Sequence, residues 1–286
     1  MNEYLLERRL KEKAPNLHLL MGNNVTILNR MLKSFLSWFP DFTDHSALHS
    51  LNVLDYCNRL MGGQVDQLSP AECYVLIMAC YLHDTGLCIS RKDFEIFSRE
   101  LGLEDYRKTH KDKSEADVIR EFHHEFSGAF IRKYANLFEL NSKEMLFAIV
   151  QVSRGHRKTD LLDEKEYPDL ETAAGVIRTA ALAAIIRLAD EIDMGSDRNP
   201  KFLYNTSKLT KQKDIDSFAV HDSIKMVEVR SDRIVLCVKP TEERIVPLIE
   251  KLRGKIQSVL DYCVKVVAAR SDLRITQKSV VVEEWN

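Results

Sequence analysis

The sequence has no large excess of charge of either sign. Its 286 residues include 41 Lys and Arg against 43 Asp and Glu, which gives a formal net charge of −2. A chain with this balance has no long-range attraction for nucleic acid or for an anionic membrane surface. The composition therefore disfavours both as partners and leaves small molecules as the expected ligands.

Paired cysteines, a leader and a clean apolar span are also missing. The six cysteines form no Cys-x-x-Cys pair, and four lie in apolar helical runs, which favours free buried thiols in a reducing compartment over disulfides. The first residues have no apolar core before a cleavage site, so no signal peptide is expected. The most apolar stretch, 172–189, contains Arg178 and Arg187 and falls short of a membrane span. We expect a cytoplasmic protein.

The patterns that are present predict a mainly α fold. Apolar residues make up 45% of the chain and charged residues 29%, enough for one large core or one core with a small appendage. Apolar spacing and capping signals, such as Ser69-Pro70, predict helices. Their ranges are about 25–39, 48–61, 70–83, 94–101, 115–138, 142–153 and 171–190.

After Pro200 the apolar pattern changes from helical spacing to strand-like alternation. Segments 224–229 and 234–238 alternate or cluster as strands do, and the residues between them suit a hairpin. A helix over about 246–269 and a strand near 274–284 complete a ββαβ unit. We therefore predict a helical bundle over 1–200 and a small α+β appendage over 201–286.

Five polar islands interrupt the apolar helical segments. They are His49, His83-Asp84, His124, His156 and Asp190. Successive islands are 32 to 40 residues apart, about the length of a helix, a connection and part of the next helix, so an antiparallel bundle can bring them together. Imidazole and carboxylate ligands without thiolate suit a hydrolytic Mn, Fe, Co, Ni, Zn or Mg centre rather than a structural zinc site.

The local setting of His83-Asp84 supports this interpretation. At a helix C-terminus both side chains can lean onto one ion, and the partial negative charge of the helix end favours a cation. The alternative is that the islands are unrelated core histidines and acids. That alternative is disfavoured because burying so many ionisable groups without a metal is costly.

Three of these segments together resemble the H…HD…D signature of the HD superfamily of metal-dependent phosphohydrolases. The segments are His49-Ser50-Leu51-Asn52-Val53, Tyr81-Leu82-His83-Asp84-Thr85-Gly86 and Arg187-Leu188-Ala189-Asp190-Glu191-Ile192-Asp193. The resemblance covers about residues 40–200 and implies an HD-type helical bundle. It implies that His49, His83, Asp84 and Asp190 hold a first metal ion.

A second ion is implied by likeness to two-metal members such as the HD-GYP cyclic-dinucleotide phosphodiesterases. His124, in a His-x-x-x-Gly segment, and His156 resemble their second-metal ligands, with Asp84 bridging the two ions. His123 is the alternative to His124, since helical geometry lets only one of two neighbours face inward; we favour His124. Two ions in this arrangement would share a hydroxide and clamp the attacking and leaving oxygens of a phosphoryl group.

Departures from the known subfamilies leave the substrate open. No Gly-Tyr-Pro follows His156, and Arg157 stands where the HD-GYP pattern has a second His. The run Thr85-Gly86-Leu87-Cys88 lacks the acidic pair of guanosine-tetraphosphate hydrolases and the Pro-Phe-Gly-His run of deoxynucleotide triphosphohydrolases. Residues 42–49 are more similar to HD domains of bacterial multidomain signalling or defence proteins.

Further residues near the islands are candidates for substrate contacts. Arg154, Arg157 and Lys158 flank His156 and could bind phosphate oxygens, or could form a solvated loop. His45, four residues before His49, could protonate a leaving oxygen or orient substrate, or could cap a helix. Asp193 could accept a hydrogen bond from a ligand imidazole or lie on the surface.

The sequence thus predicts a metal-dependent phosphohydrolase acting on a nucleotide or nucleotide-like phosphoester. The alternative is a regulatory module that binds a nucleotide with little or no turnover and signals through the appendage. A metal-dependent nuclease is disfavoured by the neutral charge and the lack of a basic, aromatic stripe. The appendage suits a dimerisation surface or a substrate lid. Because Val280-Val281-Val282 could pair at a sheet edge, we expect a homo-oligomer.

Overall fold

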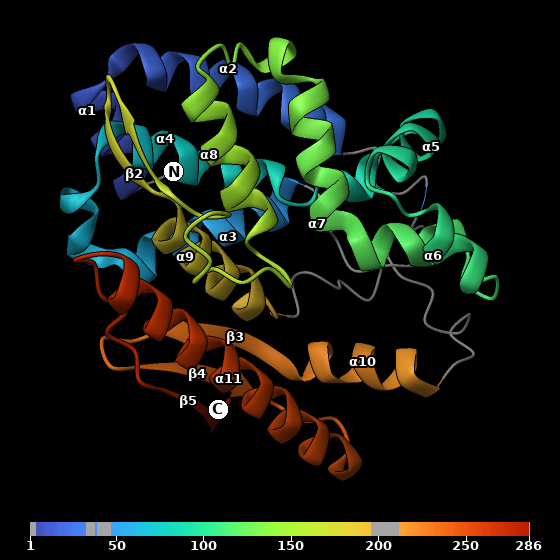
Figure 1. Cartoon of the computed structure of the whole chain (residues 1–286). Helices are drawn as coiled ribbons and strands as arrows, with labels where there is room; N and C mark the ends of the chain where they lie inside the picture. Colours follow the sequence, from blue (N-terminus) through green and yellow to red (C-terminus); the bar gives the residue numbers. More distant parts are fainter. Residues whose placement is uncertain (1–3, 33–37, 39–46, 196–211, 286) are drawn as a thin grey trace.

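The computed structural model describes residues 4–32, 38, 47–195 and 212–285 and has a mainly α fold (Figure 1). The helices of the main body are α1 (Leu5–Lys13), α2 (Pro15–Met31), α3 (Ala47–Met61), α4 (Pro70–Leu82), α5 (Arg91–Glu100), α6 (Glu104–Thr109), α7 (Glu115–Lys133), α8 (Lys143–Arg154) and α9 (Thr179–Ile192). Short 3₁₀ turns, η2 (Gly62–Gln67), η3 (Thr85–Cys88) and η4 (Ala135–Phe138), connect some of them.

Helix α4 lies at the centre of the bundle. Every residue from Ala71 to Leu82 is buried, and α4 packs against α1, α2, α3, α8 and α9. The predicted start signal is confirmed, because Ser69 and Glu72 form a reciprocal capping box and Pro70 occupies the first turn. Because other helices cover α4 on all sides, its C-terminal end lies inside the bundle, and His83-Asp84 lies there with it.

The expected helix over 171–190 is shorter than predicted. The structure has a hairpin, β1 (Asp169–Thr172) paired antiparallel with β2 (Gly175–Arg178), before α9 begins at Thr179. Gly175 has φ +112°, which only glycine adopts readily, and a Cβ there would come within 2.6 Å of Ser69 Cβ. The hairpin is held against the start of α4, because Ser69 Oγ donates to Val176 O at 2.6 Å. This long-range contact overrides the apolar pattern.

The C-terminal part contains α10 (Gln212–Ser223), β3 (Ile224–Val229), β4 (Arg233–Val238), η7 (Glu243–Ile245), α11 (Val246–Arg270) and β5 (Ser279–Glu284). Strand β4 pairs antiparallel with β3 and parallel with β5. This arrangement confirms the predicted ββαβ order, and α10 was not predicted. Strand β5 is at an edge of the sheet, but the predicted homo-oligomer stays a prediction.

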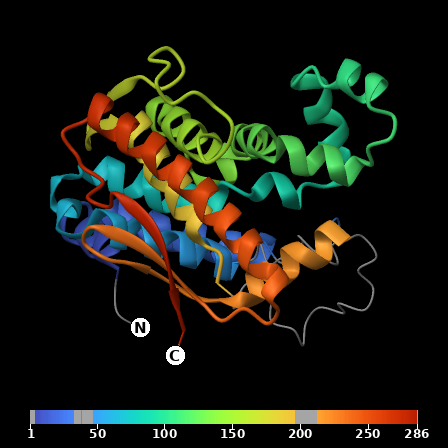
Figure 2. The ribbon, with the colours of Figure 1, turned by 90° about the horizontal axis from the view of Figure 1, so that it is seen from below.

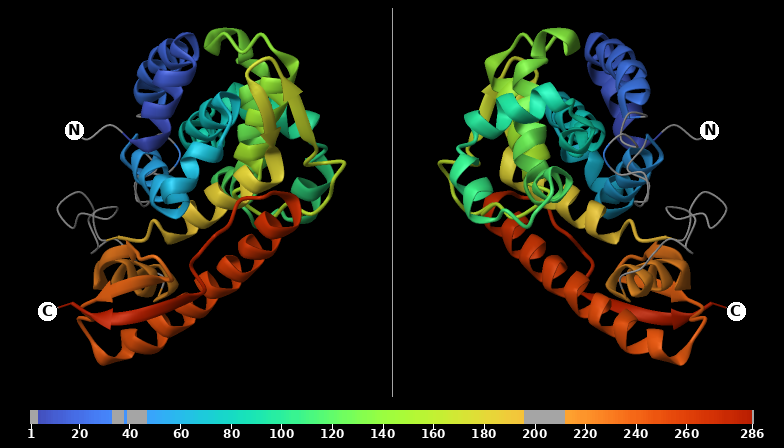
Figure 3. Two further views of the ribbon diagram at one scale, coloured as in Figure 1. Left: turned by 90° about the vertical axis from the view of Figure 1, so that its left-hand side faces the viewer. Right: turned by 90° about the vertical axis from the view of Figure 1, so that its right-hand side faces the viewer.

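Helix α11 packs along α9, which joins the C-terminal part to the bundle (Figures 2 and 3). Leu260 and Cys263 of α11 belong to the same buried apolar cluster as Ile185 and Ile186 of α9. The predicted boundary between two units, near residue 200, lies outside the described residues. The division at that point therefore stays a prediction, and α9 is in contact with both parts.

All six cysteines lie in the described ranges, and all are free, which confirms the predicted thiols. Five are buried, and Cys88 is half-buried. Among the described helices none is by itself long and apolar enough to cross a membrane; one bent pair, Pro70–Cys88 with Arg91–Glu100, meets the length and composition criteria only jointly.

The buried thiols predict a loss of stability in alkali. Burial raises the pKa of Cys73 and of Cys263 to about 12. A group whose pKa is raised on folding stabilises the protein fully below its unfolded pKa, and this share is lost as pH rises toward the folded pKa. Between about pH 9 and pH 10.5 we expect the free energy of unfolding to fall by about 2 kcal/mol per thiol, measured by urea unfolding under reducing conditions. The Cys73→Ala variant should lose stability less steeply over this range; an unchanged slope would contradict the prediction.

Candidate metal centre

The His83-Asp84 dyad lies where α4 stops. His83 is still helical, whereas Asp84 has φ −103° and ψ 7° and begins the turn into η3. Ser127 of α7 fixes this end, because its Oγ donates to His83 O at 2.5 Å and accepts from Gly86 N at 2.8 Å. The turn separates the directions of the two side chains and holds both in the interior.

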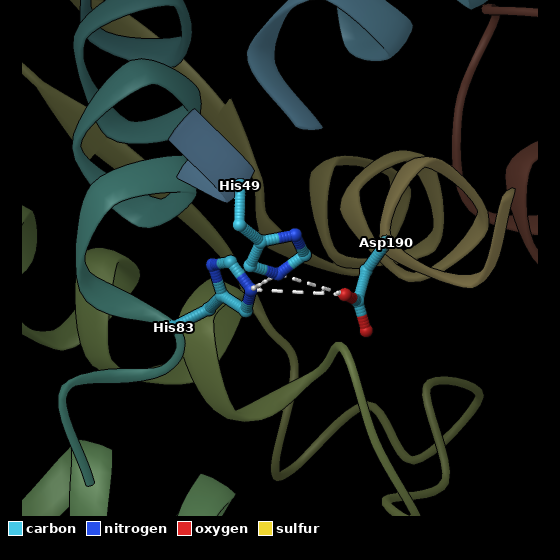
Figure 4. A group of neighbouring side chains, drawn as sticks. All are labelled: His49, His83 and Asp190. Carbon is cyan, nitrogen blue, oxygen red and sulfur yellow. Dashed lines mark hydrogen bonds and ion pairs between the residues drawn. The ribbon is translucent and has the colours of Figure 1, made fainter. Parts of the chain in front are cut away.

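The first candidate ligand group joins α3, α4 and α9 (Figure 4). His49 Nε2 lies 3.1 Å from His83 Nε2 and 3.3 Å from Asp190 Oδ1, and His83 Nε2 lies 3.8 Å from the same oxygen. Both imidazoles are fully buried, whereas the Asp190 side chain is 20% exposed. The site therefore opens to solvent on the side of Asp190.

The second candidate group consists of Asp84, His123 and His156. His123 Nε2 lies 2.9 Å from His156 Nε2, and the two nitrogens lie 3.5 and 3.7 Å from Asp84 Oδ1. The other carboxylate oxygen of Asp84, Oδ2, lies 3.4 Å from His49 Nε2 and 3.5 Å from His83 Nε2. Asp84 thus presents one oxygen to each pair of histidines.

Hydrogen bonds at Nδ1 orient all four imidazoles. His49 Nδ1 lies 2.6 Å from Asp193 Oδ2, as the sequence suggested for Asp193. The Nδ1 atoms of the other three rings lie 2.5 to 3.0 Å from the backbone carbonyls of Cys80, Arg120 and Ser153. These acceptors place the neutral-ring proton on Nδ1, so that each Nε2 lone pair points into the site.

Converging lone pairs fit divalent cations. Two nitrogen lone pairs at 2.9 or 3.1 Å with no proton between them repel, and a cation removes that repulsion. Two ligands bonded to one ion at about 2.1 Å are roughly 3.0 Å apart at a right angle and roughly 3.4 Å apart at the tetrahedral angle. The observed separations within each group are close to these values. Each of the two groups of described residues could therefore hold a divalent cation.

The pKa shifts agree with neutral rings and ionised carboxylates. Burial, with the neighbouring imidazoles, lowers the pKa of His156, and burial also lowers the pKa of His123. Burial alone would raise the pKa of Asp190, but the adjacent His49 and His83 lower it, so this carboxylate is ionised. These are the protonation states that metal ligands need.

The structure corrects the choice between the two neighbouring histidines of α7. His123 faces Asp84 and His156, whereas His124 Nε2 lies 3.7 Å from Glu125 Oε1, and its buried Nδ1 has no hydrogen-bond partner among the described residues. The reason is a break in α7 at Phe122, with φ −110° and ψ 15°, which changes the direction of the residues that follow. The likeness of residues 124–128 to a His-x-x-x-Gly segment gave no sign of this break.

The other predicted site residues have different surroundings. Arg154 is bound by Glu125, to which Nε and Nη2 donate at 2.9 and 2.7 Å, and its Nη1 lies 3.0 Å from Glu166, so it braces α7 against α8. Arg157 is half-buried, and its side chain forms no hydrogen bond or ion pair with the described residues. Lys158 is exposed. His45 lies outside the described residues, so its predicted role stays a prediction.

Two supporting residues were missed by the sequence reasoning. Asn52 donates to Asp193 at 3.2 Å, and Ser127 binds the dyad as described above. Asn52 lies three residues after His49, one turn along the same helical face, and this spacing is the signal that could have found it. Nothing local marks Ser127, which approaches from a helix more than forty residues away.

Gly86 is required for the contact between η3 and α7. A Cβ at this position would lie 2.2 Å from His123 O and 2.7 Å from Ser127 N, both backbone atoms that cannot move alone. We expect Gly86→Ala to lower the free energy of unfolding by about 3 kcal/mol, measured by urea unfolding. The matched control is Gly254→Ala in α11, where a Cβ meets nothing within 4 Å and helix propensity should add about 0.5–1 kcal/mol. Equal stability of the two variants would refute this assignment.

The helical bundle and the His-Asp cluster together define an HD-type domain, which confirms the resemblance seen in the sequence. The model of the HD-CE family matches residues 39–271, more than half of the chain. The chain belongs to the HD-CE family. No curated protein and no solved structure matches it.

Proposed function

We propose that the protein is a metal-dependent phosphohydrolase acting on a nucleotide or nucleotide-like phosphoester. The observation that carries the proposal is the position of Asp84, whose two oxygens face two separate pairs of inward-pointing imidazoles. We propose two divalent ions, drawn from Mn, Fe, Co, Ni, Zn and Mg, because imidazole and carboxylate donors accept all of these.

The donor set supports hydrolysis without a nucleophilic side chain. When bound, a pair of divalent cations supplies Lewis acidity and lowers the pKa of water to roughly 7. The chain's own groups hold the imidazoles neutral through Nδ1, and Asp193 and the three backbone carbonyls keep their orientation. Substrate would approach past Asp190, the most exposed of the candidate ligands.

Arg157 is the cation best placed to bind a phosphoryl group. It directly follows His156, a member of the second ligand group, and its charge contributes to lowering the pKa of His123. Since it has no partner among the described residues, its guanidinium is available for two-pronged binding to phosphate oxygens. Arg154 is already bound by Glu125 and would act by positioning α7 and α8.

The decisive experiment combines elemental analysis of the purified protein with a hydrolysis screen over nucleoside mono-, di- and triphosphates and cyclic nucleotides. We expect two metal equivalents and release of phosphate or nucleoside that stops on chelation and returns with metal. A nucleotide retained tightly without turnover would instead support the regulatory module, and a protein that neither turns over nor binds a nucleotide would refute both.

A further inference from the structure

An open pocket lies between the loop after α8, helix α9 and helix α11. We call it the cationic pocket, and its volume is about 550 Å³, within the range of roughly 300–1,000 Å³ typical of small-molecule sites. The residues that line it are Lys158, Thr159, Asp160, Arg187, Lys255, Ser258, Val259 and Tyr262. Half of them belong to α11, so the C-terminal part of the chain supplies one wall (Figure 2).

The charges of the pocket favour an anion. Three lining residues are cationic and one, Asp160, is acidic. Lys255 also pairs with Glu191 at 2.7 Å, so three cations face two carboxylates and one positive charge remains. The Asp160 carboxylate already accepts two hydrogen bonds, one from Tyr262 OH at 3.1 Å and one from Leu162 N at 3.1 Å.

Arg187 supplies positive charge without a carboxylate partner among the described residues. Nε donates to Gly155 O at 2.7 Å and Nη2 donates to Thr159 O at 2.8 Å. These bonds fix a half-buried guanidinium, while Nη1 donates to none of the described residues and is not buried. A fixed guanidinium with an unused N–H edge is suited to phosphate oxygens.

The remaining wall is apolar and aromatic. The Arg187 guanidinium lies 5.1 Å from the Tyr262 ring centroid, and Val259 lies one turn earlier on α11. Tyr262 is held in place because its hydroxyl accepts from Leu161 N at 2.8 Å as well as donating to Asp160. A flat or apolar group beside the phosphate would contact this wall.

Residues of the cationic pocket hydrogen-bond or ion-pair with direct sequence neighbours of two candidate metal ligands. Gly155, which Arg187 binds, precedes His156, and Glu191, which Lys255 binds, follows Asp190. The pocket and the centre therefore use the same loop and the same helix, but none of the pocket residues belongs to either candidate ligand group.

We propose that the cationic pocket binds a phosphate-bearing small molecule of nucleotide size, with Lys158, Lys255 and Arg187 contacting its phosphate. The phosphate belongs either to the distal part of a substrate held at the metal centre or to a separate effector. The binding itself does not depend on turnover, so it stands apart from the proposed hydrolase activity.

The test is calorimetric titration of ADP into the full chain carrying Asp84→Asn, in the presence of a chelator, so that the metal centre does not bind the phosphates. We expect one ADP per chain and no saturable binding of adenosine. Lys158→Gln and Lys255→Gln should each weaken ADP binding roughly fivefold, whereas Lys255→Arg, which keeps the charge, should stay within roughly twofold.

Lys265→Gln is the matched control, because Lys265 is exposed on the same helix and does not line the pocket. It should leave ADP binding unchanged. Absence of saturable ADP binding, equal binding of adenosine, or an equal loss in Lys265→Gln and Lys255→Gln would overturn the proposal. Melting curves of the variants show whether each is folded.

Kinetics of the metal-loaded protein with Asp84 intact distinguish the two sources of the phosphate. If the pocket holds a distal substrate group, Lys158→Gln and Lys255→Gln raise KM for nucleoside polyphosphates but not for p-nitrophenyl phosphate. If it holds an effector, added ADP changes kcat for p-nitrophenyl phosphate, whereas ADP bound as a substrate at the metal centre would compete and change only the apparent KM. A protein without any turnover would refute the proposed function and leave the binding result to decide the pocket.

Discussion

Asp84→Asn is expected to lower turnover by roughly 1,000-fold, equivalent to about 4 kcal/mol of transition-state stabilisation, and to release metal from the protein. The physical reason is that the carboxylate of Asp84 faces both imidazole pairs, at 3.4 and 3.5 Å through Oδ2 and at 3.5 and 3.7 Å through Oδ1. An amide has the same shape but no negative charge and only one acceptor oxygen. The measurements are metal content by elemental analysis and kcat on the substrate found in the screen.

Asp261→Asn provides the control, because Asp261 is exposed on α11, where its carboxylate accepts a hydrogen bond from Gln257 at 2.8 Å, and it belongs to neither candidate ligand group. This variant should keep full metal content and turnover. The assignment of Asp84 fails if Asp84→Asn retains two metal equivalents and wild-type kcat.

The second large effect separates two adjacent histidines. His123→Ala should lose one metal equivalent and at least roughly 100-fold in turnover, because His123 Nε2 faces His156 and Asp84. His124→Ala should keep both equivalents, since His124 Nε2 lies toward Glu125 instead. Elemental analysis and steady-state kinetics of the two variants measure this difference directly.

A matched comparison is available because both side chains are buried to the same extent, with 7% of each residue exposed. Any general cost of truncating a buried imidazole in α7 therefore applies to both variants and cancels. Loss of metal in His124→Ala with retention in His123→Ala would reverse the assignment and support His124 as the ligand.

Most of the candidate centre could be predicted from the sequence because its ligands are tied to helix ends and helix spacing. His49, His83, Asp84, His156 and Asp190 were identified as islands in apolar segments, and the structure brings all five together. Regular helical length sets the separation between such islands along an antiparallel bundle. The sequence also offered Asp193, one turn after Asp190, as an acceptor for a ligand imidazole or as a surface acid, and the structure pairs it with His49.

In both places where the structure corrects the sequence predictions, the backbone departs from a regular helix. Periodicity assumes a regular backbone, but α7 breaks at Phe122, and residues 169–178 form a hairpin held against Ser69. Both deviations are enforced by segments distant in the chain. Gly86 backs onto the carbonyl of His123, and the hairpin turn needs the space that Gly175 leaves beside Ser69.

The roles of the charged residues on either side of His156 could not be predicted from the local sequence either. Arg154, Arg157 and Lys158 are close in sequence, yet Arg154 is bound by Glu125, Arg157 is unpaired among the described residues, and Lys158 lines the cationic pocket. An arginine is available to a ligand only if no carboxylate from another helix reaches it first, and the sequence does not state which helices are neighbours.

The sequence by itself determined the ligand types, the helices that carry most of them and the order of the C-terminal ββαβ unit, because capping, apolar spacing and strand alternation are local properties of the chain. Tertiary structure alone decided that His123 rather than His124 faces Asp84, and that α11 closes a pocket beside α9. These outcomes depend on which segments, distant in the chain, pack against one another. Close packing selects those neighbours, and no short-range sequence pattern encodes them.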